Sequence, residues 1–225
     1  QDNLAKGATQ HTMKKRKVSN AVIRRLPRYY QTLDHLYKEG HVRISSSALG
    51  NYMGVTASQI RQDLSCFGEF GQQGYGYTIP DLRKEISEIL GMNKGYRAVL
   101  LGAGNLGRAL IKNFPFHDSG FELLTAFDTD PAIIGTAING IPVLPLSELD
   151  SFVAEHEISV GILTVPMHAA HDLAERLVAA GVKGIWNFTN TEIDIQSQHV
   201  TVESIHFADS LLTLSYLISN PTLEK

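Results

Sequence analysis

Three glycines in the middle of the chain have the spacing that lets a backbone bind phosphate. Gly102, Gly104 and Gly107 lie in the segment 97–110, RAVLLGAGNLGRAL, between a short apolar run and the start of a helix. In this Gly-x-Gly-x-x-Gly pattern the first glycine permits a tight turn, the second admits a pyrophosphate close to the backbone, and the third lets the helix pack on the strand. The pyrophosphate would lie at the helix N-terminus, where free N–H groups and the helix dipole favour an anion. The sequence therefore predicts a dinucleotide site at residues 102–107.

A carboxylate after the next apolar segment supports this prediction. Asp128 follows residues 121–127, FELLTAF, and lies 21 residues beyond Gly107. An acid at the end of this second strand is placed to accept hydrogen bonds from the adenosine ribose hydroxyls, so we expect NAD(H) as the ligand. Two alternatives remain: a glycine-rich turn that binds nothing, and a turn that binds another nucleotide such as coenzyme A.

The segments around this turn alternate between apolar strands and amphipathic helices, which predicts an α/β fold with a parallel, doubly wound sheet. Strands are expected at 97–101, 121–128, 138–144, 158–166 and 184–188, and helices at 106–113, 148–156 and 168–180. Ligands of such sheets bind beyond the carboxyl ends of the strands, although the loops after the later strands could also be plain connections. The residues expected to bind the cofactor are Gly102, Ala103, Gly104, Asn105, Leu106, Gly107, Asp128, Thr164, Val165, Pro166, Asn187 and Phe188.

The first third of the chain is predicted to be helical. Ser19, one of the serines at 45–47, and Thr56 can each cap a helix, because their side-chain oxygens can accept a hydrogen bond from a free backbone N–H. Pro27 is expected to restart or kink the first helix, since proline lacks the N–H group and clashes with the preceding turn. Two short helices in succession, the second over 57–66, form a helix-turn-helix.

The helix over 57–66 has two different faces. Ile60, Leu64 and Phe67 recur at i, i+4 and i+7 and are expected to be buried. The opposite face carries small, amide and guanidinium side chains, and these can bind base edges: Arg binds guanine and Gln binds adenine, each with two hydrogen bonds. We therefore expect a DNA recognition helix, the alternative being an ordinary solvated face. Here the residues expected to contact DNA are Arg25, Ser46, Ser58, Gln59, Arg61, Gln62 and Ser65.

A wing and a basic tail would extend this interface. Residues 68–79, GEFGQQGYGYTI, combine glycines with aromatic residues and predict a hairpin, whose tip could touch phosphates or the minor groove. Residues 1–95 carry 14 Lys and Arg against 8 Asp and Glu, whereas residues 96–225 carry 6 against 15. A basic first third suggests contact with a polyanion. The further residues expected to bind DNA are Lys14, Lys15, Arg16, Lys17, Gln72, Gln73, Gly74 and Tyr75.

Composition narrows the class of protein and suggests four parts. No run approaches the roughly 20 apolar residues of a membrane helix, and no metal-ligand spacing is evident among the nine histidines. The single Cys66 excludes an intramolecular disulfide and fits a reducing, cytoplasmic compartment. We expect a vector remnant at 1–12, a winged-helix DNA-binding domain at 13–91, a Rossmann domain at 96–206 and an apolar C-terminal helix at 207–219. That helix could cover its own domain or pack into a partner subunit, and we favour a dimer.

Together these motifs resemble the Rex family of redox-sensing transcriptional repressors. The resemblance implies a homodimer whose C-terminal helices are exchanged and which binds palindromic, double-stranded operator DNA. It also implies that NADH releases the protein from DNA, that NAD+ competes for the same site, and that the chain is not an enzyme. The segments that carry the resemblance are 25–30, 60–68, 74–77, 102–107, 163–166 and 184–188.

Two functions of other classes remain open beside this one. A small NAD-dependent oxidoreductase would use the same turn, but only a helix is expected after the strand at 184–188, and no general acid or base is evident. A coenzyme A-binding regulator would also use the turn. Asp128 is expected to disfavour NADP(H), because its charge repels the 2′-phosphate.

Overall fold

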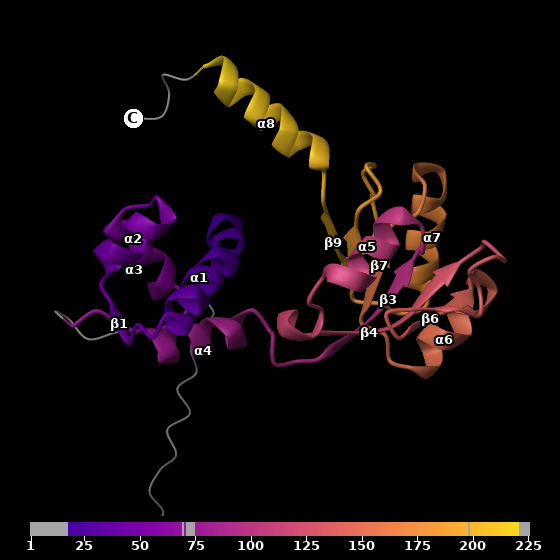
Figure 1. Cartoon of the computed structure of the whole chain (residues 1–225), viewed down its shortest axis with the longest axis horizontal. Coiled ribbons are helices and arrows are strands. Elements are labelled where there is room, and N and C mark those ends of the chain that lie inside the picture. The colour runs from indigo at the N-terminus through magenta and orange to yellow at the C-terminus, as the bar shows by residue number, and fades with distance from the viewer. Residues whose placement is uncertain (1–17, 69, 71–74, 198, 221–225) are drawn as a thin grey trace, which may run out of the picture. The chain divides into compact units, whose positions relative to one another are not determined.

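The structure, a computed structural model, describes residues 18–68, 70, 75–197 and 199–220 (Figure 1). It divides into two compact units, of which the first ends at Gly91 and the second begins at Met92. Within the described residues, no helix combines the length and the apolar character needed to span a membrane. The expectations for residues 1–12, for Lys14, Lys15, Arg16 and Lys17, and for Gln72, Gln73 and Gly74 lie outside the described residues.

The first unit contains the expected helices, and the three predicted caps are confirmed. The side chains of Ser19, Ser45 and Thr56 each accept a hydrogen bond from a backbone N–H of the helix that follows. The first helix continues through Pro27 and does not restart there. The elements are α1 (Asn20–Lys38), β1 (Arg43–Ile44), α2 (Ser46–Met53), α3 (Ala57–Ser65), β2 (Tyr77–Thr78) and α4 (Ile79–Ile89).

The described strand of the expected wing, β2, pairs with β1 in an antiparallel ladder. Gly76, directly before β2, has φ +71°, and a Cβ atom there would lie 2.5 Å from the carbonyl oxygen of Ile44. Glycine is therefore required for this close approach. The described pairing thus joins the wing segment to the chain between α1 and α2.

The core of the first unit lies between its helices. Ile60 and Leu64 are buried as the helical periodicity predicted, and they pack with Tyr29 and Leu33 of α1 and Ile86 of α4. Burial of this stripe fixes which face of α3 turns inward, so the opposite face of α3 is left to solvent.

The second unit is a seven-stranded sheet with helices on both faces, which confirms the predicted α/β fold. The strand order is β5-β6-β4-β3-β7-β8-β9, and all neighbours except β5 and β6 run parallel. The elements are β3 (Tyr96–Leu101), α5 (Asn105–Asn113), a 3-10 turn (His117–Ser119), β4 (Phe121–Asp128), β5 (Ala137–Ile138), β6 (Ile141–Pro145), a second 3-10 turn (Leu146–Glu148), α6 (Leu149–Glu155), β7 (Val160–Leu163), α7 (Met167–Ala179), β8 (Gly184–Asn187), β9 (Thr201–Ser204) and α8 (Phe207–Ser219).

The order of the strands places the topological switch at the centre of the sheet. The chain builds one half outward from β3 through β4 to β6, and then crosses to the other side of β3 to add β7, β8 and β9. Ligands of doubly wound sheets bind at such a switch point, beyond the carboxyl ends of the two central strands. Here those strands are β3 and β7.

The strand β9 was not predicted, because the expected sheet ended at residue 188. Its four residues, Thr201 to Ser204, carry one large apolar side chain, Val202, and lie at the edge of the sheet. So short and polar a segment has no distinctive hydrophobic pattern. The expectation that only a helix follows residues 184–188 is therefore wrong.

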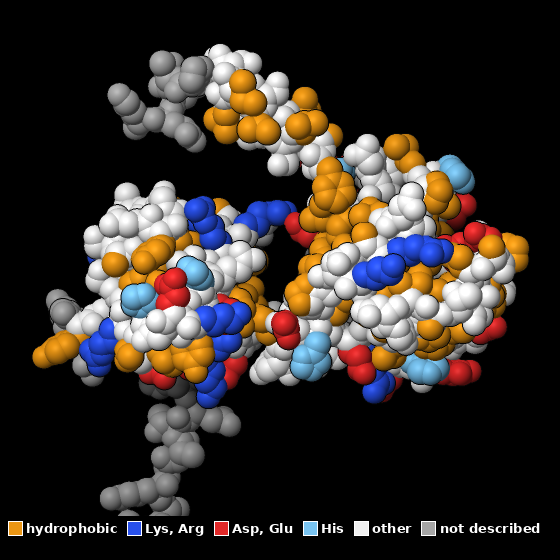
Figure 2. All heavy atoms as spheres, in the orientation of Figure 1, with side chains coloured by type: hydrophobic (Ala, Val, Ile, Leu, Met, Phe, Trp, Pro, Cys, Tyr) orange, Lys and Arg blue, Asp and Glu red, His pale blue; other side chains and the backbone are white. Residues whose placement is uncertain are grey.

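The two faces of the sheet are covered unequally. On one face, Leu149 and Val153 of α6 and Leu173 and Leu177 of α7 are buried against the strands. On the other face, the helix that joins the buried cluster is α5, through Ile111. In α8 none of the residues is buried, and Figure 2 shows hydrophobic side chains along its length. The second unit thus exposes an apolar helix and leaves part of one sheet face with little helical cover.

Candidate cofactor edge and DNA interface

Residues 102–104 form the turn between β3 and α5, and the protein's own packing explains two of the three glycines. Gly102 has φ +96°, and a Cβ atom there would lie 2.8 Å from the carbonyl oxygen of Thr164. A Cβ atom at Gly107 would collide with the carbonyl oxygen of Gly102. At Gly104, in contrast, a Cβ atom would meet no described atom within 4 Å. The open space before Gly104 is therefore where a ligand can approach the backbone.

The same position opens onto the N-terminus of a helix. Gly104 is the N-cap of α5 and supplies no side-chain hydrogen bond to the first turn. The free N–H groups of that turn and the positive end of the helix dipole both favour an anion. The geometry of the turn therefore fits the pyrophosphate of a dinucleotide.

Asp128 ends β4 beside this turn and helps to hold it. Its Oδ2 accepts a hydrogen bond of 2.6 Å from the N–H of Ala103, and its Oδ1 accepts from the N–H groups of Thr129 and Asp130 at 2.7 and 2.9 Å. A carboxylate has about four lone-pair sites, so Asp128 can support the turn and still accept from a ribose hydroxyl.

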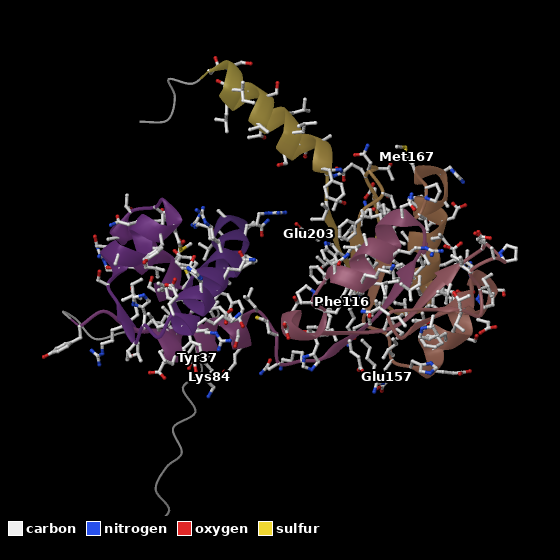
Figure 3. The ribbon with its side chains drawn as sticks, in the orientation of Figure 1. Tyr37, Lys84, Phe116, Glu157, Met167 and Glu203 are labelled. Atoms are coloured by element: carbon white, nitrogen blue, oxygen red, sulfur yellow. The ribbon has the colours of Figure 1, made fainter. Side chains whose placement is uncertain are left out.

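Thr164 brings the end of β7 against the glycine turn. Its Oγ1 donates a hydrogen bond of 2.7 Å to the carbonyl oxygen of Gly102, and its backbone N–H donates one of 2.9 Å to the carbonyl oxygen of Leu101. Val165 is half-buried and Pro166 is exposed. Met167, which begins α7, is also exposed (Figure 3). The structure therefore places residues 164–166 at the edge where the sequence predicted cofactor contacts.

Asn187 lies at the same edge, but its side chain is occupied. It is 1% exposed and its amide makes four hydrogen bonds. The Nδ2 donates to the Thr191 carbonyl (2.8 Å) and to Ser204 Oγ (3.0 Å), and the Oδ1 accepts from the N–H and Oγ1 of Thr189 (2.9 and 2.7 Å). These bonds use the full capacity of a carboxamide. The side chain of Asn187 is therefore fully occupied within the protein, and Phe188 is likewise buried.

The predicted recognition face of α3 is exposed. Ser58, Arg61, Gln62 and Ser65 all lie on the solvent side of this helix. Arg61 donates a hydrogen bond of 3.0 Å to Ser46 Oγ, which joins α3 to α2. Tyr75 is also exposed, with the guanidinium of Arg43 over its ring. This surface has the donors and acceptors that base edges require.

Arg25 and Gln59 have partners that the sequence did not indicate. Both donate to the carboxylate of Asp63 on α3, Arg25 through two bonds of 2.6 and 2.8 Å and Gln59 through one of 2.7 Å. Tyr29 donates a fourth bond of 2.9 Å to the same carboxylate. Asp63 is fully buried and lies three residues after the buried Ile60, a spacing that could have placed it on the inner face. The contacts of Arg25 and Tyr29 with Asp63 fix α3 against α1, and any contact of Arg25 or Gln59 with DNA would be additional.

The contacts of Asp63 also set its charge. Burial alone would raise its pKa, but the hydrogen bonds from Arg25, Gln59 and Tyr29 outweigh burial and hold the pKa below its ordinary value. Burial, together with the hydrogen bond to Asp63, raises the pKa of Tyr29. Asp63 and Arg25 therefore form an ion pair of a carboxylate and a guanidinium between α3 and α1. Among the described residues, no group of three or more His, Cys, Asp or Glu is arranged to hold a metal ion.

The fold and the site define a helix-turn-helix regulator joined to a domain of the dinucleotide-binding type. The chain is 46% identical over 206 residues to the redox-sensing transcriptional repressor Rex of Clostridium beijerinckii. The aligned region covers 92% of this chain and 97% of the relative. It therefore belongs to the Rex family of redox-sensing transcriptional repressors. The Rex repressor of Thermoanaerobacter pseudethanolicus is also 46% identical, over 94% of both chains.

Solved structures agree with this assignment, and two family models each match one part of the chain. A crystal structure of RSP, a Rex-family repressor, in complex with beta-NAD+ and operator DNA has a TM-score of 0.86 and 45% identity, over 93% of this chain and 96% of that one. The RSP complex with beta-NADH has a TM-score of 0.85 and 42% identity, over 93% and 98%. Residues 17–65 match the family model described as putative DNA-binding protein N-terminus, and residues 93–191 match the CoA binding domain.

Proposed function

We propose that this chain is a homodimeric repressor that binds palindromic operator DNA and leaves it when NADH binds at the glycine turn. The observation that carries the proposal is the open space before Gly104, where two other glycines are already required by packing. The complexes of the RSP relative with beta-NAD+ and operator DNA, and with beta-NADH, support the same ligands here. The chain would act in the cytoplasm, where these ligands occur together.

The cofactor would lie across the carboxyl ends of β3, β4 and β7. Its pyrophosphate would approach Gly104 and the N–H groups of Asn105 and Leu106, and its adenosine ribose would approach Asp128. The nicotinamide would lie toward residues 164–166. Because the carboxylate of Asp128 repels a 2′-phosphate, the site would prefer NADH to NADPH.

Operator DNA would be read by the exposed face of α3. Arg61 and Gln62 can each bind a base edge with two hydrogen bonds, whereas Ser58 and Ser65 would contact either a base or the backbone. We assign the DNA-binding domain to 13–91, the NAD(H)-binding domain to 96–206 and the exchanged helix to 207–219. NADH would release DNA by binding more tightly to the dimer that cannot hold the operator, and by linkage the operator would weaken NADH binding equally.

Two apolar surfaces of the second unit support a dimer. Phe207, Leu211, Leu214 and Ile218 recur along one side of α8, with exposed fractions between 51% and 70%. So much apolar surface on one helix is typical of an interface. In the proposed dimer the α8 helices of the two copies are exchanged and covered.

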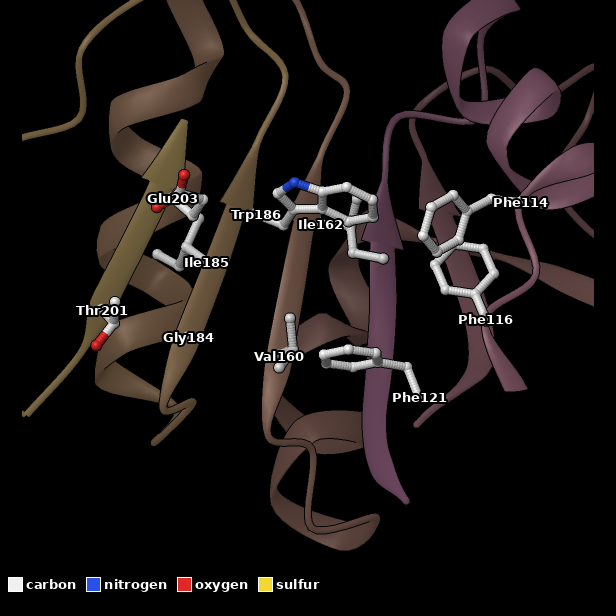
Figure 4. A pocket seen from close by; sticks show the side chains of 10 residues that line it. All are labelled: Phe114, Phe116, Phe121, Val160, Ile162, Gly184, Ile185, Trp186, Thr201 and Glu203. Atoms are coloured by element: carbon white, nitrogen blue, oxygen red, sulfur yellow. The ribbon is translucent and has the colours of Figure 1, made fainter. Parts of the chain in front are cut away.

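The second apolar surface is a cavity of about 340 Å³ on the less covered face of the sheet. Figure 4 shows Trp186 of β8 and Phe114 and Phe116 after α5 around it, with Glu203 of β9 at its side. These rings pack edge to face, at centroid distances of 4.8 to 5.0 Å. An apolar hollow on a sheet face is the kind of surface that a second copy can cover.

A titration with labelled DNA tests the proposal. The probe is a palindromic duplex selected by this protein from a random library, and its binding is followed by fluorescence anisotropy with NADH, NAD+, NADPH or coenzyme A added. NADH should release the duplex at the lowest concentration, NAD+ should compete with weaker effect, and coenzyme A should do neither. Release by NADPH or coenzyme A as readily as by NADH would overturn the proposal. Turnover of NADH with a small carbonyl substrate would indicate an oxidoreductase instead.

A further inference from the structure

Asn187 is the most completely satisfied polar side chain at the cofactor edge. Its carboxamide is 1% exposed, and its four bonds reach two other segments: the loop at 189–191, through Thr189 and the carbonyl of Thr191, and the end of β9, through Ser204. Burying an amide without these partners would be costly. The chain therefore uses Asn187 to hold three segments in one arrangement.

The segments that Asn187 holds lead directly to α8. Ser204 is the last residue of β9, the backbone N–H of Ile205 donates to the carbonyl of Asn187 at 2.8 Å, and α8 begins at Phe207. The ring of Phe188, the next residue after Asn187, lies 6.3 Å from the ring of Phe207 between centroids. Ile205, which leads into α8, and Phe207, which begins it, thus both contact the end of β8.

The end of β8 is attached in turn to the glycine turn. The N–H of Phe188 donates to the carbonyl of Leu163 at 2.9 Å, and the next residue, Thr164, contacts the carbonyl of Gly102. Hydrogen bonds therefore run across four strand ends, from the turn that would bind the pyrophosphate to the base of the helix that would join the subunits. A displacement at one end of a contiguous hydrogen-bond network can displace the other end when the residues of the network have two discrete conformations.

We propose that Asn187 is a positioning residue that couples the cofactor edge to the base of α8, an inference that rests on the proposed function. The side chain does not bind the cofactor. It fixes the loop at 189–191 and the end of β9 relative to β8, so that movement of residues 164–166 on cofactor binding is transmitted to residues 205–207. If Asn187 lacked its bonds to Ser204 and Thr191, the cofactor would still bind but would change the position of α8 less.

Variants of Ser204 test this coupling without burying a charge. Ser204→Ala removes one bond of Asn187, and Ser204→Thr keeps a hydroxyl that can accept it. Ser151→Ala is the matched control, because it removes a bond of 3.0 Å from a serine of α6 to the carbonyl of Glu148. For each protein, the dissociation constant of the selected duplex is measured by anisotropy without NADH and with saturating NADH, and NADH affinity is measured by nicotinamide fluorescence. The ratio of the two duplex constants is the coupling factor.

We expect Ser204→Ala to lower the coupling factor about threefold or more, out of the roughly 5- to 150-fold typical of allosteric proteins. Its affinities for free NADH and for the duplex alone should stay within about twofold of the parent, and Ser204→Thr should restore the coupling. An unchanged coupling factor in Ser204→Ala would overturn the inference, as would an equal loss in Ser151→Ala. If the parent itself shows no effect of NADH on DNA, it is the proposed function that fails.

Discussion

The physical reason for a glycine differs among the three glycine positions of the turn at 102–107. Gly102 and Gly107 are required because a side chain would strike the backbone of Thr164 or of Gly102 itself. Gly104 has φ −71° and open space, so any residue could occupy it in the protein alone. A glycine that the protein does not need indicates that something else approaches there. This distinction makes Gly104 the best position at which to separate binding from folding.

Replacing Gly104 by Ser should remove cofactor binding and leave the fold intact. Serine is a favourable N-cap, so we expect the melting temperature to change by less than about 2 °C. Its hydroxymethyl group would occupy the space of the pyrophosphate, so NADH affinity should fall about tenfold or more, equal to about 1.4 kcal/mol. NADH fluorescence titration and thermal unfolding measure the two effects.

The contrasting variant is Gly107→Ala. Its Cβ atom would collide with the carbonyl of Gly102, so it should unfold several degrees below the parent. Full NADH affinity in Gly104→Ser would contradict the assignment of the pyrophosphate to this turn.

Asp128→Asn tests the choice between NADH and NADPH. The carboxamide keeps one acceptor oxygen, so it can accept from the N–H of Ala103 only by turning its NH2 toward the N–H groups of Thr129 and Asp130, and the melting temperature is therefore measured beside the affinities. Because the repelling charge is gone, the preference for NADH over NADPH should narrow about tenfold, measured by competition titration. Asp130→Asn is the control, since that carboxylate bonds to the N–H of Ala132. Equal affinities for NADH and NADPH in the parent would contradict the role given to Asp128.

Among the elements, α3 depends on a polar contact as well as on its apolar stripe. Ile60 and Leu64 determine which face turns inward, whereas the three bonds from Arg25 and Tyr29 to Asp63 tie α3 to one position along α1. Apolar side chains can slide past one another at little cost, but a bidentate guanidinium–carboxylate pair cannot. We therefore expect this contact to set the orientation of Arg61 and Gln62 toward DNA.

Asp63→Asn should weaken the first unit and change its pH dependence. The pKa of Asp63 lies below its ordinary value in the folded chain. Its carboxylate therefore stabilises the fold above the unfolded pKa of about 3.9, and this contribution is lost as the pH falls through the folded pKa. At neutral pH the unfolding free energy of the variant should be about 1–3 kcal/mol below that of the parent. On acidification the unfolding free energy of the variant should fall less than that of the parent.

Urea unfolding at neutral and acidic pH, followed by far-UV circular dichroism, measures this change. The fluorescence of Trp186, the single tryptophan, reports on the second unit and should be unchanged. Asp150→Asn, which breaks an exposed pair with Arg176, should cost less than about 1 kcal/mol. If the unfolding free energies of the parent and of Asp63→Asn differed by the same amount at every pH, the carboxylate would not act through its charge.

For the molecule as a whole, the proposed mechanism makes α8 the element that connects the state of the cofactor site to assembly. A helix with no buried residue and a row of Leu, Ile and Phe side chains is unstable in water by itself. It requires a covering surface, and in the proposed dimer a second copy supplies it. Two winged-helix domains joined in this way can read both halves of a palindrome together.

Charges on the apolar side of α8 should separate the subunits. Leu211→Glu combined with Ile218→Glu should convert a dimer into a monomer, seen by light scattering coupled to gel filtration. Affinity for the palindromic duplex should fall about 100-fold or more, because the two half-sites are no longer bound by one assembly. Thr213→Glu places the same charge on the other side of the helix and should leave the mass unchanged. A dimer that survives the double substitution would mean that α8 does not join the subunits.

Features that depend on neighbours along the chain were predicted from the sequence. The caps at Ser19, Ser45 and Thr56, the buried stripe at Ile60 and Leu64 and the alternating strands and helices all follow from spacings of a few residues, and the structure confirms them. The glycine pattern and the acid after the second strand likewise indicated where a cofactor would lie.

Only the tertiary structure decided which polar side chains hold the parts together. Arg25 reaches Asp63 across 38 positions and Asn187 reaches Ser204 across 17, and no periodic pattern encodes such pairs. The edge strand β9 was missed because four mainly polar residues gain their place through pairing with β8. The sequence by itself determined the type of fold and the location of the candidate site. The structure showed that Gly104 is open and that Asn187 is occupied, because burial and hydrogen-bond satisfaction are properties of the packed chain.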